Sequence, residues 1–171
     1  MTKEYYFRLR KHYQPPKIKT VFVLESPPVS GKYFYDESGL VSEPLFSAMM
    51  KLLPIVPQTK KEGLQQFAST GHFLVDATYE PVNELKGKDR EKAILKNYDK
   101  LVEDLGSLGN SKLISFILVK ANICRLLEPK LKSSGFNVIN NGVILPFPSN
   151  GWQKVFLEKI SEIYKFKPNN A

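Results

Sequence analysis

The sequence predicts a single α/β domain, a three-layer α/β/α arrangement around a four-stranded, mostly parallel central sheet. Three observations lead to this prediction. Four short apolar runs end abruptly in polar or Pro-rich sequence, segments with helical spacing lie between them, and no repeat or low-complexity tract divides the chain. A chain of 171 residues is also close to the usual size of one domain, so residues 1–171 are expected to fold as one unit.

The four apolar runs are the expected strands of the sheet. Continuous Val, Ile, Leu and Phe runs of this length are typical of strands that are covered on both faces, as in parallel sheets. Ligands of such sheets bind beyond the carboxyl ends of the strands, so the residues that follow each run are the place to look for a site. The runs comprise residues 20–24, 72–75, 113–119 and 142–145.

Four segments between and after these runs have the apolar spacing of helices. In the first, Leu45, Met49 and Leu52 recur on one face, and Ser42 is the expected N-cap. Strands that alternate with helices predict βαβ units with right-handed crossovers, and hence helical layers on both faces of the sheet. The expected helices comprise residues 42–53, 89–105, 121–132 and 152–164.

The composition excludes several classes of protein and favours one kind of partner. No apolar run approaches the roughly 18 residues of a membrane-spanning helix, and charges interrupt the N-terminal segment, so we expect a cytoplasmic protein without membrane association. Cys124, His12 and His72 form no cluster of metal-ligand spacing, so neither a metal nor another cofactor is expected, and we expect a monomer. The net charge of +8 favours a nucleic-acid partner; a merely basic, solvated surface is the alternative.

Glu25 and Asp76 are the candidate catalytic residues, because each follows one of the apolar runs directly. A carboxylate at the end of a strand is placed to activate a water or to orient a substrate. Two plainer interpretations stay open: a capping or ion-paired glutamate, and an aspartate that forms a turn by bonding to the backbone. We expect Glu25, Asp76 and Phe147 to line one cleft.

The binding candidates come from the loops beyond the expected strands. Aromatic side chains beside a lysine, as in residues 32–35, can stack on bases while the cation meets phosphate, or can simply plug the edge of the sheet. The start of the last helix can face a phosphate with its backbone N–H groups, or be capped only. Residues 86–90 are either a phosphate-contacting loop or a solvated turn. The candidates for base or substrate binding are Ser26, Pro27, Pro28, Phe34, Tyr35, Thr78, Tyr79 and Phe147, and those for nucleic-acid binding are Lys32, Lys86, Lys88, Lys120, Ser149 and Asn150.

Four motifs occur in order along the chain. Leu24-Glu25-Ser26-Pro27-Pro28 follows the first strand, residues 73–77 and 115–120 read Phe-Leu-Val-Asp-Ala and Ser-Phe-Ile-Leu-Val-Lys, and Phe147-Pro148-Ser149-Asn150 precedes a helix that bears aromatic residues. In this order the motifs resemble those of the uracil-DNA glycosylase superfamily, over residues 19–164. The first is similar to that family's Gly-Glu-Ala-Pro-Gly, and the last stands where the family has His-Pro-Ser-Pro.

The resemblance implies a uracil-DNA glycosylase-like fold and a divergent DNA glycosylase, a hydrolase of base excision in DNA repair. Such an enzyme binds DNA, flips a damaged or modified base into a pocket and hydrolyses its N-glycosidic bond. Phe147 stands where the family has the histidine that steadies the departing base, Asp76 where many members have a base-reading asparagine, and Ser26 where one branch has a water-activating aspartate.

Two other functions stay open: a catalytically inactive nucleic-acid-binding module on the same fold, and an enzyme that acts on a small nucleotide or nucleoside. The exchange of asparagine for aspartate also bears on the choice of base. An ionised Asp76 only accepts hydrogen bonds and favours amino-bearing bases over uracil, whereas a protonated Asp76 can also donate. The remaining alternative is that Asp76 only braces its loop.

Overall fold

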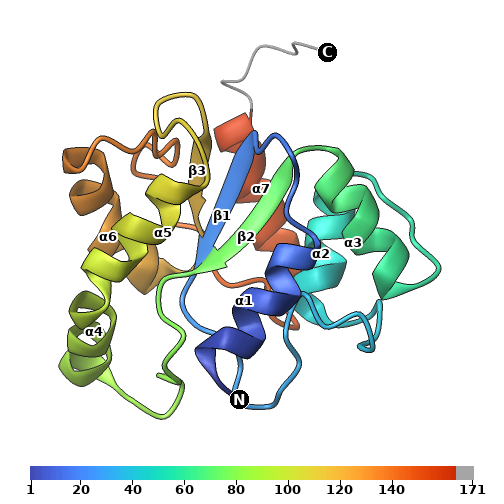
Figure 1. The fold of residues 1–171 in the computed structure, drawn as a ribbon, viewed down its shortest axis with the longest axis horizontal. Helices are drawn as coiled ribbons and strands as arrows, with labels where there is room; N and C mark the ends of the chain where they lie inside the picture. Colours follow the sequence, from blue (N-terminus) through green and yellow to red (C-terminus); the bar gives the residue numbers. More distant parts are fainter. Residues whose placement is uncertain (165–171) are drawn as a thin grey trace.

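A three-stranded parallel sheet forms the centre of the molecule in the computed structural model, which describes residues 1–164 (Figure 1). The strands are β1 (Thr20–Leu24), β2 (His72–Asp76) and β3 (Ser115–Leu118), in the spatial order β2-β1-β3. Thr20 pairs with both His72 and Ser115, so the three strands begin level with one another. Their carboxyl ends therefore meet at the same edge of the sheet.

The prediction of a fourth strand over residues 142–145 is wrong. The chain does return beside β3, but only through one bridge, in which Phe116 donates to Asn137 O at 2.9 Å and accepts from Ile139 N at 2.9 Å. The Asn140 side chain then takes the next backbone position, accepting from Leu118 N at 2.8 Å and donating to Leu118 O at 2.9 Å. Asn141 follows with a φ of 47°, which turns the chain away before residues 142–145 can pair.

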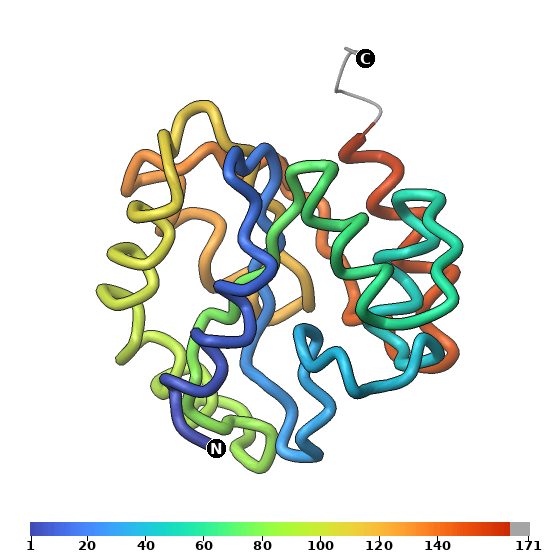
Figure 2. Tube along the Cα trace, turned by 45° about the vertical axis from the view of Figure 1, so that its right-hand side comes forward, coloured from blue at the N-terminus to red at the C-terminus, as the bar shows by residue number. Residues whose placement is uncertain are grey.

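Seven helices lie within residues 1–164, and they cover both faces of the sheet. Figures 1 and 2 show α1 and α5 in front of the strands and α6 and α7 behind them, which gives three layers. No helix in this part of the chain is long and apolar enough to cross a membrane. The helices are α1 (Lys3–His12), α2 (Pro44–Leu52), α3 (Lys60–Ser69), α4 (Gly87–Lys96), α5 (Tyr98–Ser107), α6 (Ala121–Ser133) and α7 (Gln153–Tyr164).

Two expected helices differ in detail from the observed ones. The helix expected over residues 42–53 begins at Pro44, and its N-cap position is Glu43 rather than Ser42. The single helix expected over residues 89–105 is two helices, α4 and α5, which meet at Asn97. The Asn97 side chain donates to Ala93 O at 2.9 Å, a local bond of the kind by which asparagine competes with helix continuation.

Two further helices, α1 and α3, were not predicted from the apolar pattern. Both begin at a threonine whose side chain accepts a backbone N–H, Thr2 from Tyr5 and Thr59 from Glu62. Thr59 and Glu62 have the Thr-x-x-Glu spacing of a capping box, which is a sequence signal for the start of α3.

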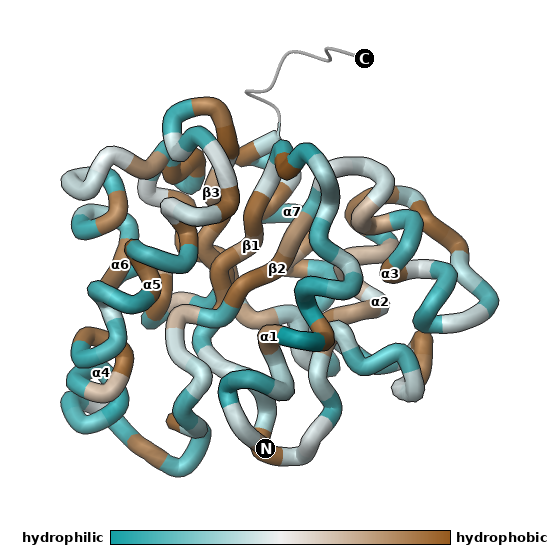
Figure 3. The backbone as a smooth tube through the Cα atoms, viewed as in Figure 1, coloured by the Kyte–Doolittle hydropathy of each residue, from teal (hydrophilic) through white to brown (hydrophobic). Residues whose placement is uncertain are grey.

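The core lies on both sides of the strands. Every residue of β1 is buried, and in Figure 3 the hydrophobic tube of the strands contrasts with the hydrophilic stretches of α1 and α5. This arrangement explains why the strands are continuous apolar runs rather than alternating ones. It leaves the carboxyl edge of the sheet as the place where polar groups can gather.

Candidate functional site

A cavity of about 380 Å³ lies at the carboxyl edge of the sheet. Its wall begins at the end of β1, continues through the loop before α2, and is completed by side chains from β2, α4, the end of β3 and the segment before α7. The volume is within the usual range of small-molecule sites. Ten of the residues singled out from the sequence line it: Glu25, Ser26, Pro27, Pro28, Lys32, Phe34, Asp76, Lys120, Phe147 and Ser149.

The other six candidates lie elsewhere. Tyr35 is in the core, where its hydroxyl accepts a hydrogen bond from Leu74 N at 2.7 Å. Thr78 and Tyr79 line a second cavity of about 280 Å³, which Asp76 also lines. Lys86 and Lys88 are exposed at the start of α4, and Asn150 lines a shallow groove along α7. The structure thus brings Glu25, Asp76 and Phe147 together and leaves these six outside the cavity.

The backbone at the sheet edge fixes where Glu25 and Asp76 stand. The β1–β2 ladder continues past the strand ends, because Ala77 N donates to Leu24 O at 2.7 Å and Thr78 N donates to Glu25 O at 3.0 Å. Leu24 and Asp76 are direct partners across the two strands. Each carboxyl group is therefore carried by a rigid element rather than by a mobile loop.

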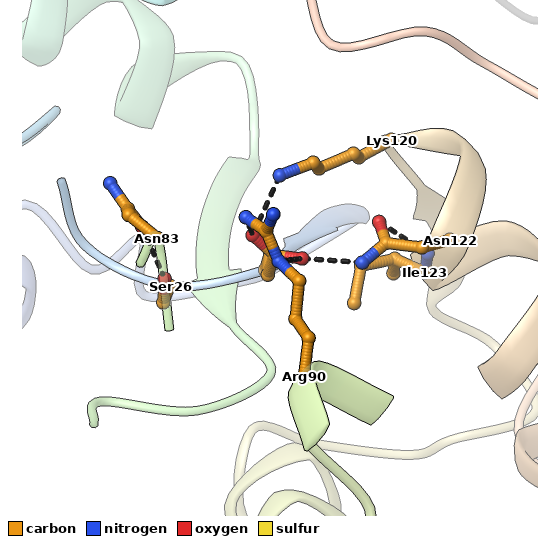
Figure 4. Close-up of polar contacts among 7 residues, drawn as sticks. Ser26, Asn83, Arg90, Lys120, Asn122 and Ile123 are labelled. Atoms are coloured by element: carbon orange, nitrogen blue, oxygen red, sulfur yellow. Dashed lines mark hydrogen bonds and ion pairs between the residues drawn. The ribbon is translucent and has the colours of Figure 1, made fainter. Parts of the chain in front are cut away.

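Glu25 is the centre of a polar cluster, drawn in Figure 4. Its Oε1 accepts from Lys120 Nζ at 2.6 Å and from an Arg90 guanidinium N–H, and its Oε2 accepts from Arg90 Nε at 2.9 Å and from the Asn122 amide. A carboxylate has about four acceptor positions, and these four bonds occupy all of them. A water-activating role for Glu25 would require one of these bonds to open.

The charge state of Glu25 follows from this cluster. Burial opposes ionisation of the carboxyl, but the hydrogen bonds from Arg90, Lys120 and Asn122 outweigh it and hold the pKa of Glu25 below its ordinary value. Glu25 is thus an anion that fixes two cations at the cavity wall. The plainer expectation of an ion-paired glutamate describes the geometry of this residue.

Asp76 has the opposite surroundings, although it belongs to the same cavity. Burial is the main cause that raises its pKa to about 7; the charges of Glu25 and Asp104 also raise it, while Arg10 lowers it. Its Oδ2 is buried and has no hydrogen-bond partner among residues 1–164. A buried acceptor without a partner is uncommon and costly, and it distinguishes Asp76 from the fully bonded Glu25.

Tyr33 adds a second polar group of the same kind. Its hydroxyl is buried and also lacks a partner among the described residues, and Tyr33 lines the same cavity as Asp76. Burial, together with the nearby Tyr79 and Asp76, raises the pKa of Tyr33 well above its ordinary value, so the hydroxyl stays protonated. Asp76 Oδ2 and the Tyr33 hydroxyl do not bond to each other.

The loop that carries Tyr33 is held in place by a buried lysine. Lys60 donates to Tyr33 O at 2.7 Å and to Glu43 at 2.8 Å, and its side chain is 0% exposed. Next to it, the Phe34 ring packs against the rings of Phe46 and Phe67. The wall of the cavity beside the two unpartnered polar groups is therefore apolar, aromatic and fixed.

Several of these residues were not found from the sequence. Asn122 lies two residues past Lys120, in a segment that follows β3 as the strand-end rule requires, so a signal for it existed. Tyr33 and Arg90 lie within residues 32–35 and 86–90, which the sequence indicated as possible ligand-contacting loops, although neither residue was named as a candidate. Lys60 had no such signal, because its role depends on where α3 packs. Among residues 1–164, no group of three or more His, Cys, Asp or Glu side chains could hold a metal ion.

The comparisons with known proteins found no match: no family model, no curated protein and no solved structure is similar to this chain. The cavity combines the side chains of Asp76 and Tyr33 with aromatic walls and with the cations Arg90 and Lys120.

Proposed function

We propose that this chain binds DNA and accepts one extruded base in the cavity at the carboxyl edge of the sheet. The observation that carries the proposal is the cavity itself, whose wall combines Asp76 with the aromatic side chains of Phe34 and Phe147. A base has flat aromatic faces and hydrogen-bonding edges, and such a cavity complements both. The motif order that resembles uracil-DNA glycosylases supports the same function.

The charges around the cavity support a phosphate-bearing ligand. Lys32 is exposed beside the cavity, and Arg90 and Lys120 retain 23% and 31% side-chain exposure while they bond to Glu25. Arg90 and Lys120 share one carboxylate, that of Glu25, and the whole chain carries +8. Such a surface attracts the DNA backbone while the cavity receives the base.

Hydrolysis of the N-glycosidic bond is the second candidate function, and the observation that favours it is the presence of two carboxyl groups, Glu25 and Asp76, at one cavity. A carboxyl with a pKa of about 7 exchanges protons at neutral pH, as a general base must. In this reaction a water attacks the sugar C1′ and gives its proton to Asp76, the C1′–N bond breaks, and the base leaves with the bonding pair. Phe147 lines the cavity but donates no proton, so protonation of the departing base falls to solvent or to Asp76.

The test uses labelled duplexes that carry one unpaired or modified nucleotide, with the purified chain at low salt. We expect fluorescence anisotropy to detect tighter binding to these duplexes than to a fully paired one, since an unpaired base is extruded at lower cost. Cleavage of the strand after alkali treatment would add hydrolysis. No preference for the unpaired nucleotide, or binding of mononucleotides but not of DNA, would overturn the proposal.

Glu25→Gln distinguishes two roles of Glu25, the positioning of cations and the activation of water. The substitution keeps the shape of the side chain but removes its charge, so Arg90 and Lys120 lose their shared anion. If Glu25 only positions cations, duplex affinity should change while any alkali-sensitive cleavage persists. If Glu25 also activates water, cleavage should vanish as well.

A further inference from the structure

We propose that residues 83–96, which comprise α4 and the segment before it, form a movable wall of the cavity. This segment, called the flap below, opens at its contacts with the loop after β1, and its opening leaves Glu25 with unfilled acceptor positions. The inference rests on the proposed function only for the identity of the ligand, because the opening can be measured on the chain alone.

The flap is attached to the rest of the molecule by few buried side chains. Val82, just before it, is fully buried, but within residues 83–96 only Ile94 is buried, and most of the other residues are exposed. Asn83 and Arg90 nevertheless line the cavity. Figure 1 shows α4 at the margin of the molecule. Segments with so little buried apolar surface open locally at a lower free energy than the core does.

The backbone offers a hinge at each side of α4. Asn97 interrupts the helical path between α4 and α5, with a φ of −97° and a ψ of 5°, and it is itself buried. Gly87 begins α4 with a φ of 50°, and a Cβ added there would meet nothing within 4 Å. Hinges are a few residues at the ends of elements that absorb a change of backbone angles. The helix can therefore turn as one body while α5 stays in place.

Two polar contacts hold the flap closed, and both go to the loop after β1 (Figure 4). Arg90 Nε donates to Glu25 Oε2 at 2.9 Å, and a second guanidinium N–H donates to Oε1. Asn83 Oδ1 accepts from Ser26 Oγ at 3.3 Å. Apart from bonds to its immediate neighbours in the sequence, these are the hydrogen bonds that join the flap to the rest of residues 1–164. Because the Arg90 side chain is 23% exposed, water can take the place of Glu25 when the flap opens.

Opening changes what Glu25 can do. In the closed structure Arg90, Lys120 and Asn122 fill all of its acceptor positions. Loss of the two bonds from Arg90 leaves those from Lys120 and Asn122, so the carboxylate keeps one cation and gains two unfilled acceptor positions at the cavity wall. A ligand donor or an attacking water requires such positions. The position of the flap therefore determines whether Glu25 can take part in binding or in activation of water.

Hydrogen exchange of the whole chain without ligand tests the opening. We expect the amides of α4 to exchange faster than those of β1 and α6 and to respond less to low concentrations of urea, since a local opening exposes little surface. Arg90→Ala should speed exchange in α4 about tenfold or more and leave β1 unchanged. Lys92→Ala is the matched control, because Lys92 is exposed on the same helix and carries the same charge.

Glu25→Gln should also speed exchange in α4, and the double variant with Arg90→Ala should add little, because both substitutions break one contact. Equal effects of Arg90→Ala and Lys92→Ala would overturn the inference. So would exchange of α4 at the rate and with the urea dependence of β1. This comparison within the wild-type chain remains decisive even if a variant does not fold.

A second measurement connects the flap with the ligand. Asn83→Ala removes the contact with Ser26 without a change of charge, so it should speed association of a duplex with one unpaired nucleotide about threefold in stopped-flow anisotropy. Gln65→Ala, at an exposed position on α3, should leave the rate unchanged. Equal rates for wild type and Asn83→Ala would show that the flap does not control access and would overturn the inference. Failure to bind any duplex would overturn the proposed function, and the exchange comparison would still decide whether the flap opens.

Discussion

At the scale of single residues, the surroundings of two carboxyl groups in one cavity shift their pKa values in opposite directions. Glu25 has all its acceptor positions filled by Arg90, Lys120 and Asn122, and it is ionised. Asp76 is buried with one oxygen unpartnered, and its pKa lies near 7. A pair of carboxyls whose pKa values are driven apart is a common signature of a functional site.

The stability of the chain should therefore depend on pH through Asp76. Its folded-state pKa, about 7, lies above the ordinary aspartate value of 3.8, so between these two pH values the folded state holds a proton that the unfolded state has lost. The free energy of unfolding should fall as pH rises from about 4 to about 7 and then level off, by at most about 4 kcal/mol. Urea unfolding at pH 5 and pH 8 measures the difference.

Asp76→Asn should remove most of this dependence, because the amide does not titrate. The variant should gain stability relative to wild type at pH 8 more than at pH 5. Asp99→Asn removes an exposed carboxyl and should leave the pH profile of the wild type in place. A wild-type profile that is flat between pH 5 and pH 8 would show that Asp76 is already ionised throughout.

The sequence revealed these two carboxyls but not their partners. Glu25 and Asp76 each follow an apolar run, and parallel strands bring their carboxyl ends to one edge, so their proximity was predictable. Arg90 reaches Glu25 from α4, far along the chain. The contact between Arg90 and Glu25 depends on how α4 packs beyond the sheet, and no local pattern in the sequence predicts that packing.

At the scale of elements, the turn from β3 into α6 carries strain next to the site. Lys120 has a φ of 88°, a conformation that residues other than glycine seldom adopt. The same residue donates to Glu25 at 2.6 Å. The backbone of this turn thus holds the Lys120 ammonium group at the cavity wall, at a local cost in conformational energy.

Replacing Lys120 by glycine and by alanine should separate the two contributions. Both variants lose the ammonium group, but only glycine tolerates the positive φ. Lys120→Gly should therefore be more stable than Lys120→Ala by about 1 kcal/mol in urea unfolding.

The control is Lys100, exposed within α5, where the order should reverse because glycine is unfavourable inside a helix. Equal stability of Lys120→Gly and Lys120→Ala would mean that the turn relaxes when the ion pair is lost.

Two predicted elements differ from the observed ones because an asparagine side chain bonds to the backbone nearby. Residues 142–145 are apolar enough for a strand, and Leu145 is fully buried, but the Asn140 side chain has already taken the ladder position beside Leu118. The apolar stripe of residues 89–105 continues across α4 and α5, yet Asn97 interrupts the helix with its own side chain. The spacing of apolar residues indicates which residues are buried. It does not indicate where a polar side chain takes the place of a backbone hydrogen-bond partner.

At the scale of the whole molecule, the fold brings three cations to the wall of one cavity. Lys32, Arg90 and Lys120 stand at the carboxyl edge of the sheet, and three parallel strands suffice to bring them there. The amino ends of the same strands lie at the opposite edge, where Lys112 is exposed three residues before β3. A substitution at each edge removes the same net charge, so the effect of a charge near the cavity can be compared with that of a charge far from it.

If DNA lies across the cavity, duplex affinity should fall steeply between about 50 and 200 mM salt, with a slope of roughly −0.9 in the double-logarithmic plot for each phosphate contacted. Lys32→Ala should weaken binding and make the slope shallower by about one contact. Lys112→Ala removes the same charge from the far edge and should leave the slope unchanged. Anisotropy titrations at four salt concentrations measure both variants against wild type. Equal effects of the two substitutions would show that the net charge of +8 attracts DNA without directing it to the cavity.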